Sequence, residues 1–260
     1  MDTSRLKATF KRAARGSRPA DEQGEADTYL LKATTSDADW AIIQQGRARS
    51  MTSLERLQTC VDSVRYVVGR DVPGAFVECG VWLGGSVLAM VLTLRDMGVD
   101  DRDVYLFDTF EGMTEPTEHD ASQFNEHALE TWRTAKQQGE TAWPYWFDGQ
   151  TFTEQKVRQL LVDTGYPEER LHFVRGRVED TIPEHAPEEL ALLRLDTDWY
   201  ESTQHELLHL YPRLAREGVL IIDDYGHWDG ARRAVDEYFA EHGPVLLTRI
   251  DYSGRLVVKT

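Results

Sequence analysis

The chain is 260 residues long, which is enough for one large domain or two small ones with a sizeable core. It carries 45 Asp and Glu against 29 Lys and Arg, a formal net charge of −16 at pH 7. Nucleic acids and anionic membranes carry phosphate that such a surface repels, so this charge argues against both as partners. A hydrophobic content of 41% with 10% aromatic residues indicates a packed globular protein rather than a disordered one.

The two cysteines, Cys60 and Cys79, cannot build a disulfide framework, and neither belongs to a metal-binding cysteine pair. This usage indicates a reducing compartment. No stretch reaches the roughly 18 to 20 apolar residues that a membrane span requires. Residues 1–20 are basic but lack the apolar centre of a secretory signal. We therefore expect a cytoplasmic protein that does not associate with a membrane.

Two kinds of segment precede the first expected strand. Residues 1–28 are polar and read as an arm, with one short amphipathic helix around Leu6, Phe10 and Ala13. Residues 29–260 are expected to form one domain. Apolar residues recur at helical spacing from Trp40 and again from Leu54, which predicts two helical additions at the start of this domain.

Short apolar runs and helical patterns then alternate. Each run is continuous rather than alternating in polarity, which indicates strands of a parallel sheet covered by helices on both faces. The expected strands are 75–79, 104–107, 171–174, 190–195 and 219–222, and the expected helices are 86–97, 201–216 and 231–241.

The C-terminal residues depart from this alternation. Residues 245–250 and 255–259 are strand-like, and only a short turn-rich segment separates them. A connection this short makes an antiparallel hairpin, because a parallel crossover needs a dozen residues or more. The result is an α/β, seven-stranded, mostly parallel sheet with an antiparallel last strand. This Rossmann-like plan fits the class I methyltransferases better than the dinucleotide-dependent dehydrogenases.

A long insertion at about 114–158 separates the second and third expected strands. It is rich in polar residues but also contains aromatic ones. Long connections in compact domains are usually functional lids or disordered segments. The aromatic residues favour a lid over a substrate: Trp132, Trp143, Tyr145, Trp146 and Phe147.

The first strand-to-helix turn carries a glycine-rich motif. Residues 78–86 read ECGVWLGGS, in which glycines let the backbone approach a ligand and the next helix presents free N–H groups. The spacing is neither that of dinucleotide binders nor that of a phosphate-binding P-loop. Glu78 would repel phosphate but suit the amino group of S-adenosylmethionine. The alternative is a tight turn that serves only helix packing.

Asp108 ends the second expected strand. A carboxylate at this place commonly accepts the two hydroxyls of an adenosine ribose. Taken alone, it could equally cap Thr109 or Gly112. Together with the glycine-rich turn, it favours an adenosine-containing cofactor.

The strongest local signal is acidic. Asp196 and Asp198 follow the fourth expected strand, and Asp223 and Asp224 follow the fifth. Ligands of open parallel sheets bind at the carboxyl ends of the strands, where these carboxylates converge. Carboxylates held so close together repel one another unless a cation neutralises them. A set of ligands with oxygen donors alone favours Mg²⁺. The alternative is that some of them cap helices, as Asp198 would cap the helix from Glu201.

A general base is needed to take a proton from a hydroxyl that is methylated. Asp198 is our first candidate, because the other three carboxylates suffice for an ion. His227 is the rival base, three residues past Asp224, although a lone histidine is more often a packing or capping residue.

These motifs resemble the macrocin O-methyltransferase (TylF-type) family, Mg²⁺-dependent enzymes that methylate sugar hydroxyls in antibiotic biosynthesis. The resemblance runs from about Met51 to Tyr238. The motifs that carry it are ECGVWLGG at 78–85, DTFEG at 108–112, GRVEDTIP at 176–183, LDTD at 195–198, YPRL at 211–214 and IIDDY at 221–225.

The resemblance implies a role for each matching residue. Asp196, Asp223 and Asp224 match the metal ligands, and Asp198 matches the proposed base. The positions that match S-adenosylmethionine contacts are Met51 in a covering loop at 49–52, Glu78, Gly80 and Ser86 in the turn, Asp108 at the ribose and Asp180 near the adenine. Arg177 and Val178 stand where the family usually has aromatic residues, and the aromatic insertion is this chain's own.

The function expected from the resemblance is transfer of a methyl group to a sugar hydroxyl of a nucleotide deoxysugar or a glycosylated natural product. Family members are commonly homodimers or higher homo-oligomers. A catechol or phenol acceptor is a second possibility, since Mg²⁺ and S-adenosylmethionine serve that chemistry too. A non-catalytic protein that senses S-adenosylmethionine or metal is the alternative outside enzymes.

Overall fold

The computed structural model describes residues 28–124, 127–147 and 152–260. Contacts divide the chain into two compact units, residues 1–41 and 42–260, and helix α3 (Asp37–Arg47) spans their boundary. In the first unit, residues 28–34 are also helical. The arm expected at 1–28, with its short helix, lies almost entirely outside the described residues.

The second unit is built on one seven-stranded sheet in the order β3-β2-β1-β4-β5-β7-β6. The pairs from β3 to β5 are parallel, whereas β7 pairs antiparallel with both β5 and β6. The expected sheet and its antiparallel last strand are therefore confirmed. The strands are β1 (Ala75–Cys79), β2 (Val104–Asp108), β3 (Leu171–Arg175), β4 (Leu190–Leu195), β5 (Leu214–Ile222), β6 (Thr248–Arg249) and β7 (Arg255–Val258).

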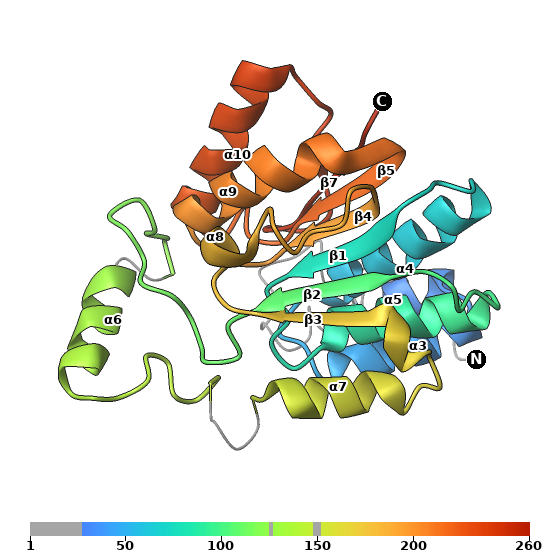
Figure 1. Ribbon diagram of the computed structural model, residues 1–260, viewed down its shortest axis with the longest axis horizontal. Helices are drawn as coiled ribbons and strands as arrows, with labels where there is room; N and C mark the ends of the chain where they lie inside the picture. The colour runs from blue at the N-terminus through green and yellow to red at the C-terminus, as the bar shows by residue number, and fades with distance from the viewer. Residues whose placement is uncertain (1–27, 125–126, 148–151) are drawn as a thin grey trace, which may run out of the picture. The chain divides into compact units, whose positions relative to one another are not determined.

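Helices cover both faces of this sheet, with α4, α5 and α7 on one face and α8, α9 and α10 on the other (Figure 1). Short 3-10 helices, η1 and η2, precede β3 and β5. The bounds are α4 (Leu54–Gly69), α5 (Gly85–Asp96), α6 (Ala128–Gln137), α7 (Glu154–Val162), η1 (Glu168–Arg170), α8 (Val178–Thr181), α9 (Tyr200–Leu210), η2 (Tyr211–Arg213) and α10 (Asp229–His242).

The two directions in which successive strand side chains point explain why helices cover both faces of the sheet. Phe76 packs into the core beneath α4 and α5, and its neighbour Val77 packs into the core beneath α9 and α10. All residues of β1 and β4 are buried. Full burial of one such side chain contributes about 1.5–3 kcal/mol, so a continuous apolar run is stable only between two layers.

The helix expected at 201–216 is wrong at its C-terminal end. Helix α9 ends at Leu210, and Pro212 follows in the 3-10 turn η2. Proline lacks the N–H that a helix interior needs and clashes with the preceding turn. Strand β5 therefore begins at Leu214, five residues before the expected start.

The insertion between β2 and β3 is shorter than expected. Helix α7 begins at Glu154 because the Thr153 hydroxyl accepts the backbone N–H of Lys156, and it buries Val157 and Leu161 in the core. This helix is the ordinary crossover between two parallel strands. The true insertion thus ends near residue 153.

Asp120 fixes the insertion to the body of the domain. This carboxylate is buried, and its Oδ1 accepts the backbone N–H of Tyr200 at 2.7 Å, at the start of α9. Its Oδ2 accepts the N–H and the hydroxyl of Thr117 at 2.7 and 2.8 Å. Asp120, rather than Asp198, therefore supplies a carboxylate to the N-terminus of α9.

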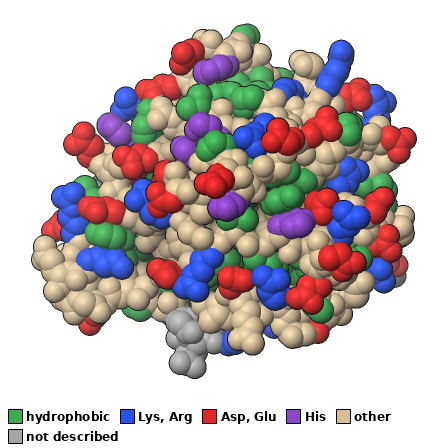
Figure 2. Space-filling model, in the orientation of Figure 1, with side chains coloured by type: hydrophobic (Ala, Val, Ile, Leu, Met, Phe, Trp, Pro, Cys, Tyr) green, Lys and Arg blue, Asp and Glu red, His purple; other side chains and the backbone are tan. Residues whose placement is uncertain are grey.

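The face in Figure 2 mixes acidic and basic side chains without a large region of one sign. In the described residues, none of the helices combines the length and the apolar character that a membrane crossing requires.

Candidate active site

A cavity of about 470 Å³ opens at the carboxyl ends of β1, β2, β4 and β5. Because β1 lies between β2 and β4, the order of the strands runs in opposite directions on the two sides of β1, from β1 to β3 on one side and from β4 to β5 on the other. Such switch points are where open α/β sheets bind ligands. The cavity walls hold nearly all the residues that the sequence singled out.

The glycine-rich turn forms one side of the cavity. Gly80 has a φ of +81°, and a Cβ there would lie 1.8 Å from the carbonyl oxygen of Asp196. Only glycine allows the turn after β1 to pass so close to the turn after β4. Gly80 and Ser86 both line the cavity, Ser86 in the first turn of α5, where backbone N–H groups lack helical partners.

Asp108 lines the same side and organises the turn. Its Oδ2 accepts the backbone N–H groups of Val81 and Trp82 at 2.7 and 3.0 Å, and its Oδ1 accepts that of Phe110 at 2.7 Å. Burial raises the pKa of Asp108, while these N–H donors oppose the shift. The carboxylate therefore joins the ends of β1 and β2 and still faces the cavity.

Two expected cofactor contacts, Glu78 and Asp180, are not among the described residues that line the cavity. Glu78 is 1% exposed, and its Oε1 accepts a hydrogen bond from Arg194 at 2.8 Å, whereas its Oε2 has no partner. Burial, with Asp196 nearby, raises the pKa of Glu78 to about 8 against the influence of Arg194. Asp180 is exposed, and its neighbour Glu179 lines the cavity instead.

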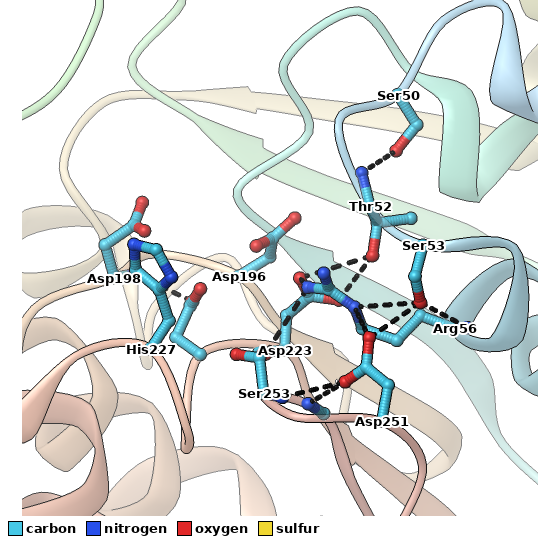
Figure 3. Close-up of polar contacts among 12 residues, drawn as sticks. Ser50, Thr52, Ser53, Arg56, Asp196, Asp198, Asp223, His227, Asp251 and Ser253 are labelled. Carbon is cyan, nitrogen blue, oxygen red and sulfur yellow. Dashed lines mark hydrogen bonds and ion pairs between the residues drawn. The ribbon is translucent and has the colours of Figure 1, made fainter. Parts of the chain in front are cut away.

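A segment at 49–52 covers the cavity from the side of α4. Met51 lines it with 52% of its surface exposed. The Thr52 hydroxyl donates to Oδ1 of Asp223 at 3.2 Å, and the Ser50 hydroxyl accepts the Thr52 N–H at 3.1 Å. The covering segment is thus joined to the carboxylates at the end of β5 (Figure 3).

Three carboxylates meet at the opposite side of the cavity. Asp196, Asp223 and Asp224 each offer an oxygen within 4.8 Å of the others. Burial and the neighbouring carboxylates raise the pKa of Asp196 to about 6 and that of Asp224 well above its ordinary value. The expected convergence of these residues is therefore present in the structure.

Asp223 differs because two buried arginines contact it. Arg194 donates to its Oδ1 at 2.6 Å, and Arg56 forms an ion pair with its Oδ2. Burial acts to raise the pKa of Asp223, but the two guanidinium groups outweigh it and the pKa is lowered. Arg56 also reaches Asp251 at 2.9 Å, in the turn between β6 and β7 (Figure 3).

Arg194 connects the carboxylates to the glycine-rich turn. Besides Asp223, it contacts Oδ2 of Asp196 and Oε1 of Glu78, each at 2.8 Å, and its side chain is 1% exposed. The sequence reasoning missed Arg194 and Arg56. A lone arginine in the apolar run of β4 was the available signal, because a buried guanidinium requires carboxylate partners.

The donor set at this side fits a hard divalent cation. It offers carboxylate oxygens alone, without cysteine or histidine, and this is the set that Mg²⁺ prefers. Burial, and then the neighbouring carboxylates, raise the pKa values of Asp196 and Asp224, and a bound cation would offset both effects.

Asp198 borders these carboxylates and lines the cavity. It adopts a left-handed φ of +68°, its N–H donates to Oδ2 of Asp224 at 3.1 Å, and its Oδ1 accepts the indole N–H of Trp228 at 2.6 Å. Burial and then Asp196 raise its pKa to about 8. It does not cap α9, whose N-cap is Trp199.

His227 also lines the cavity, but neighbouring rings hold it. Phe124 stacks on its imidazole at 5.0 Å, and its Nδ1 lies 3.0 Å from the Tyr252 hydroxyl. Burial and Arg56 lower its pKa, so the imidazole is neutral near pH 7.

Aromatic residues complete the wall around Asp198 and His227. Trp143, Trp146 and Phe147 come from the insertion and line the cavity. Tyr145 is 90% exposed, and Trp132 instead donates its indole N–H to the carbonyl of Met113 at 3.3 Å.

The fold and this cavity together define a class I methyltransferase, with the glycine-rich turn and Asp108 at the carboxyl ends of the first two strands. The profile of the macrocin O-methyltransferase (TylF) family matches residues 5–257. The chain therefore belongs to this family of O-methyltransferases, which use S-adenosylmethionine.

Individual relatives agree with this assignment. Demethyldecarbamoylnovobiocin O-methyltransferase of Streptomyces niveus is 32% identical over 214 residues, 82% of this chain and 75% of the relative. An 8-demethyl-8-(2,3-dimethoxy-alpha-L-rhamnosyl)-tetracenomycin-C 4'-O-methyltransferase of Streptomyces olivaceus is 35% identical, covering 86% and 76%. The solved structure of the O-methyltransferase NovP superposes with a TM-score of 0.69 at 32% identity, covering 83% of this chain and 86% of that one.

Proposed function

We propose that this enzyme transfers the methyl group of S-adenosylmethionine to a sugar hydroxyl of a glycosylated natural product, in a reaction that depends on Mg²⁺. The observation that carries the proposal is the cluster of Asp196, Asp223 and Asp224 with Asp198 at its border, facing the glycine-rich turn across one cavity. The tetracenomycin relative, named for the 4′ oxygen of a rhamnosyl compound, supports a sugar acceptor.

Each carboxylate has a proposed task. Asp196, Asp223 and Asp224 would hold Mg²⁺, which lowers the pKa of a hydroxyl that it binds and fixes its orientation. Asp198 would take the hydroxyl proton, and a cation bound beside it would lower the raised pKa of its carboxyl group. Asp198 is favoured over His227 as the base because the Tyr252 hydroxyl and the Phe124 ring already occupy the imidazole.

The opposite side of the cavity would bind S-adenosylmethionine. Asp108 would accept the ribose hydroxyls, and Gly80, Ser86 and Met51, which line the same cavity, would contact the rest of the cofactor. Glu78 lies behind the turn, so we assign it to holding Arg194 rather than to direct contact. We assign the side near the adenine to Glu179, because it lines the cavity and Asp180 does not.

Charge favours a glycosylated product over a nucleotide sugar. Among the described cavity-lining residues, the Lys and Arg side chains are those of Arg49, Arg56 and Arg177. Arg56 is committed to Asp223 and Asp251, and Arg177 pairs with Oε2 of Glu179 at 3.3 Å. The rings that contact His227 are those of Phe124, Trp228 and Tyr252, so this part of the wall presents aromatic rings rather than cations to a diphosphate.

A methyl-transfer assay with three acceptors tests the proposal. A glycosylated natural product, the matching nucleotide sugar and a catechol are each offered with labelled S-adenosylmethionine and Mg²⁺. We expect turnover with the glycoside. Turnover with the catechol alone would instead support the phenol hypothesis, and the Trp-rich wall makes that the second candidate. No transfer to any acceptor despite binding of S-adenosylmethionine would support a non-catalytic sensor.

Assembly and compartment complete the proposal. The resemblance implies a homodimer or higher homo-oligomer, which sedimentation velocity would measure. The two cysteines are free and buried, in keeping with the reducing cytoplasm that we propose as its compartment.

A further inference from the structure

Trp228 makes a short hydrogen bond to the residue proposed as the base. Its indole N–H donates to Oδ1 of Asp198 at 2.6 Å, and Trp228 is 6% exposed. A donor this short and sheltered from water fixes the carboxylate more firmly than solvent can. The residue comes 30 positions later in the chain than Asp198, and the sequence motifs gave it no role.

The surroundings of Trp228 hold its indole in place. Its backbone N–H donates to the carbonyl of Asp224 at 3.0 Å, just before α10 begins. The ring of Trp199 meets it edge to face at 4.8 Å, and the Trp199 indole N–H donates to the carbonyl of Thr114 at 3.2 Å. Trp228 is thereby packed between the end of β5 and the start of the insertion.

The chemistry of indole makes this contact directional. Its N–H can only donate, so it can bond only to an oxygen that carries no proton on that side. A hydroxyl or water at the same place could rotate and accept instead. The fixed donor takes one of the two lone pairs of Oδ1 and stabilises negative charge on that oxygen, so a proton delivered to Asp198 is favoured at the other oxygen, Oδ2.

We propose that Trp228 is a positioning residue that makes Oδ2 of Asp198 the atom that accepts the proton; this rests on the function proposed above. As the acceptor oxygen forms its bond to the methyl carbon, the carbon–sulfur bond breaks and its electron pair goes to sulfur. The hydroxyl proton moves to Oδ2 of Asp198. The sulfonium becomes a neutral thioether and the acceptor becomes a methyl ether, so atoms and charge balance.

The test compares Trp228→Phe with Trp132→Phe, kinetically and by calorimetric binding of S-adenosylmethionine. Both changes remove an indole N–H that donates to an oxygen, but Trp228 bonds to Asp198, whereas Trp132 bonds to the carbonyl of Met113 and does not line the cavity. A lost hydrogen bond to a charged group corresponds to about a 10- to 100-fold effect. We expect kcat to fall by that factor in Trp228→Phe, with KM and Kd for S-adenosylmethionine unchanged, and to change little in Trp132→Phe. Trp228→His, which keeps a ring N–H, should recover part of kcat.

A double-mutant cycle with Asp198→Asn separates positioning from a general structural role. If Trp228 acts through Asp198, Trp228→Phe should slow the Asp198→Asn enzyme no further. An additional slowing by the same factor as in the wild type, or an unchanged kcat in Trp228→Phe, would overturn the inference. Wild-type turnover in Asp198→Asn would instead overturn the proposed base. If Trp228→Phe does not bind S-adenosylmethionine, the double-mutant cycle with Asp198→Asn is measured with Trp228→His instead.

Discussion

At the scale of single residues, Arg194 is a buried cation that forms ion pairs with three carboxylates. One guanidinium faces Glu78, Asp196 and Asp223, and all but about 1% of its side chain is shielded from water. Each of these carboxylates would be costly to bury without it. The arginine therefore makes it possible to gather acidic groups beneath the cavity before any cation binds.

Arg194→Met should destabilise the fold strongly. Removing one partner of a buried ion pair leaves uncompensated charge and costs about 3–5 kcal/mol in the free energy of unfolding, measured with urea. Arg233→Met is the matched control, since Arg233 pairs with Glu237 at 2.7 Å on the surface. That control should change little. Equal stability of the two variants would contradict the role given to Arg194.

The buried carboxyl group of Glu206 should make the stability of the fold depend on pH. It is fully buried, its Oε1 accepts the Thr197 hydroxyl at 3.0 Å, and burial raises its pKa well above the ordinary value of 4.5. A carboxyl group whose pKa is raised in the folded state stabilises the protein at pH values below its pKa in the unfolded state. This stabilisation is lost as the pH rises toward its pKa in the folded state.

Glu206→Gln should remove that dependence. The unfolding free energy of the variant minus that of the wild type should grow above pH 4.5 by up to about 1.4 kcal/mol per pH unit. Urea titrations of both proteins between pH 5 and 7 measure it, and other groups cancel in the difference. A difference that stays flat with pH would show that Glu206 ionises normally in the folded protein.

At the scale of elements, the site depends on the crossing of two turns. Gly80 passes so close to the carbonyl of Asp196 that no Cβ fits, whereas a Cβ at Gly139, also at positive φ, would meet nothing within 4 Å. Gly139→Ala should therefore cost only the backbone strain of about 1–2 kcal/mol.

Gly80→Ala should cost more than Gly139→Ala, because the backbone after β1 or β4 must also move. It should weaken binding of S-adenosylmethionine as well, which Gly139→Ala should leave unchanged. Thermal unfolding and calorimetry compare the two variants. Similar losses in both would mean that the close approach of the turns does not matter for the cofactor.

The elements also show what local pattern predicts. The apolar runs of β1 and β4 and the Gly-rich turn were predicted where they lie, because burial on both faces and tight turns leave a local signature. The α9–η2–β5 boundary was mispredicted although Pro212 marked it, since the apolar residues continue at helical spacing past the break. Helix α7 was hidden because its polar start resembles the insertion.

The contacts of the site likewise include some that the sequence predicts and some that it does not. Asp196 and Asp223 were predicted to converge because strand ends of a parallel sheet share an edge, which is a rule of topology. The contacts of Arg56 and Trp228 were not predictable, because they join residues 167 and 30 positions apart through packing. No local pattern encodes which side chains meet at such separations.

At the scale of the whole molecule, the net charge of −16 has two parts. The face in Figure 2 shows acidic groups dispersed among basic ones, as on an ordinary solvated surface. The carboxylates at the cavity are different: Asp196, Asp198, Asp223 and Asp224 line it, and the buried Arg56 and Arg194 form ion pairs with Asp196 and Asp223 but not with Asp198 or Asp224. A divalent cation and a sulfonium cofactor are the ligands that such a site would attract.

The dependence of methyl transfer on a divalent cation is the most direct test of this account. Enzyme freed of metal with EDTA and returned to buffer is assayed with labelled S-adenosylmethionine and a glycosylated acceptor, before and after addition of Mg²⁺. The account predicts that turnover falls to background without metal and returns with Mg²⁺, while Asp196→Asn loses the response. Turnover that is unchanged after complete removal of metal would contradict it.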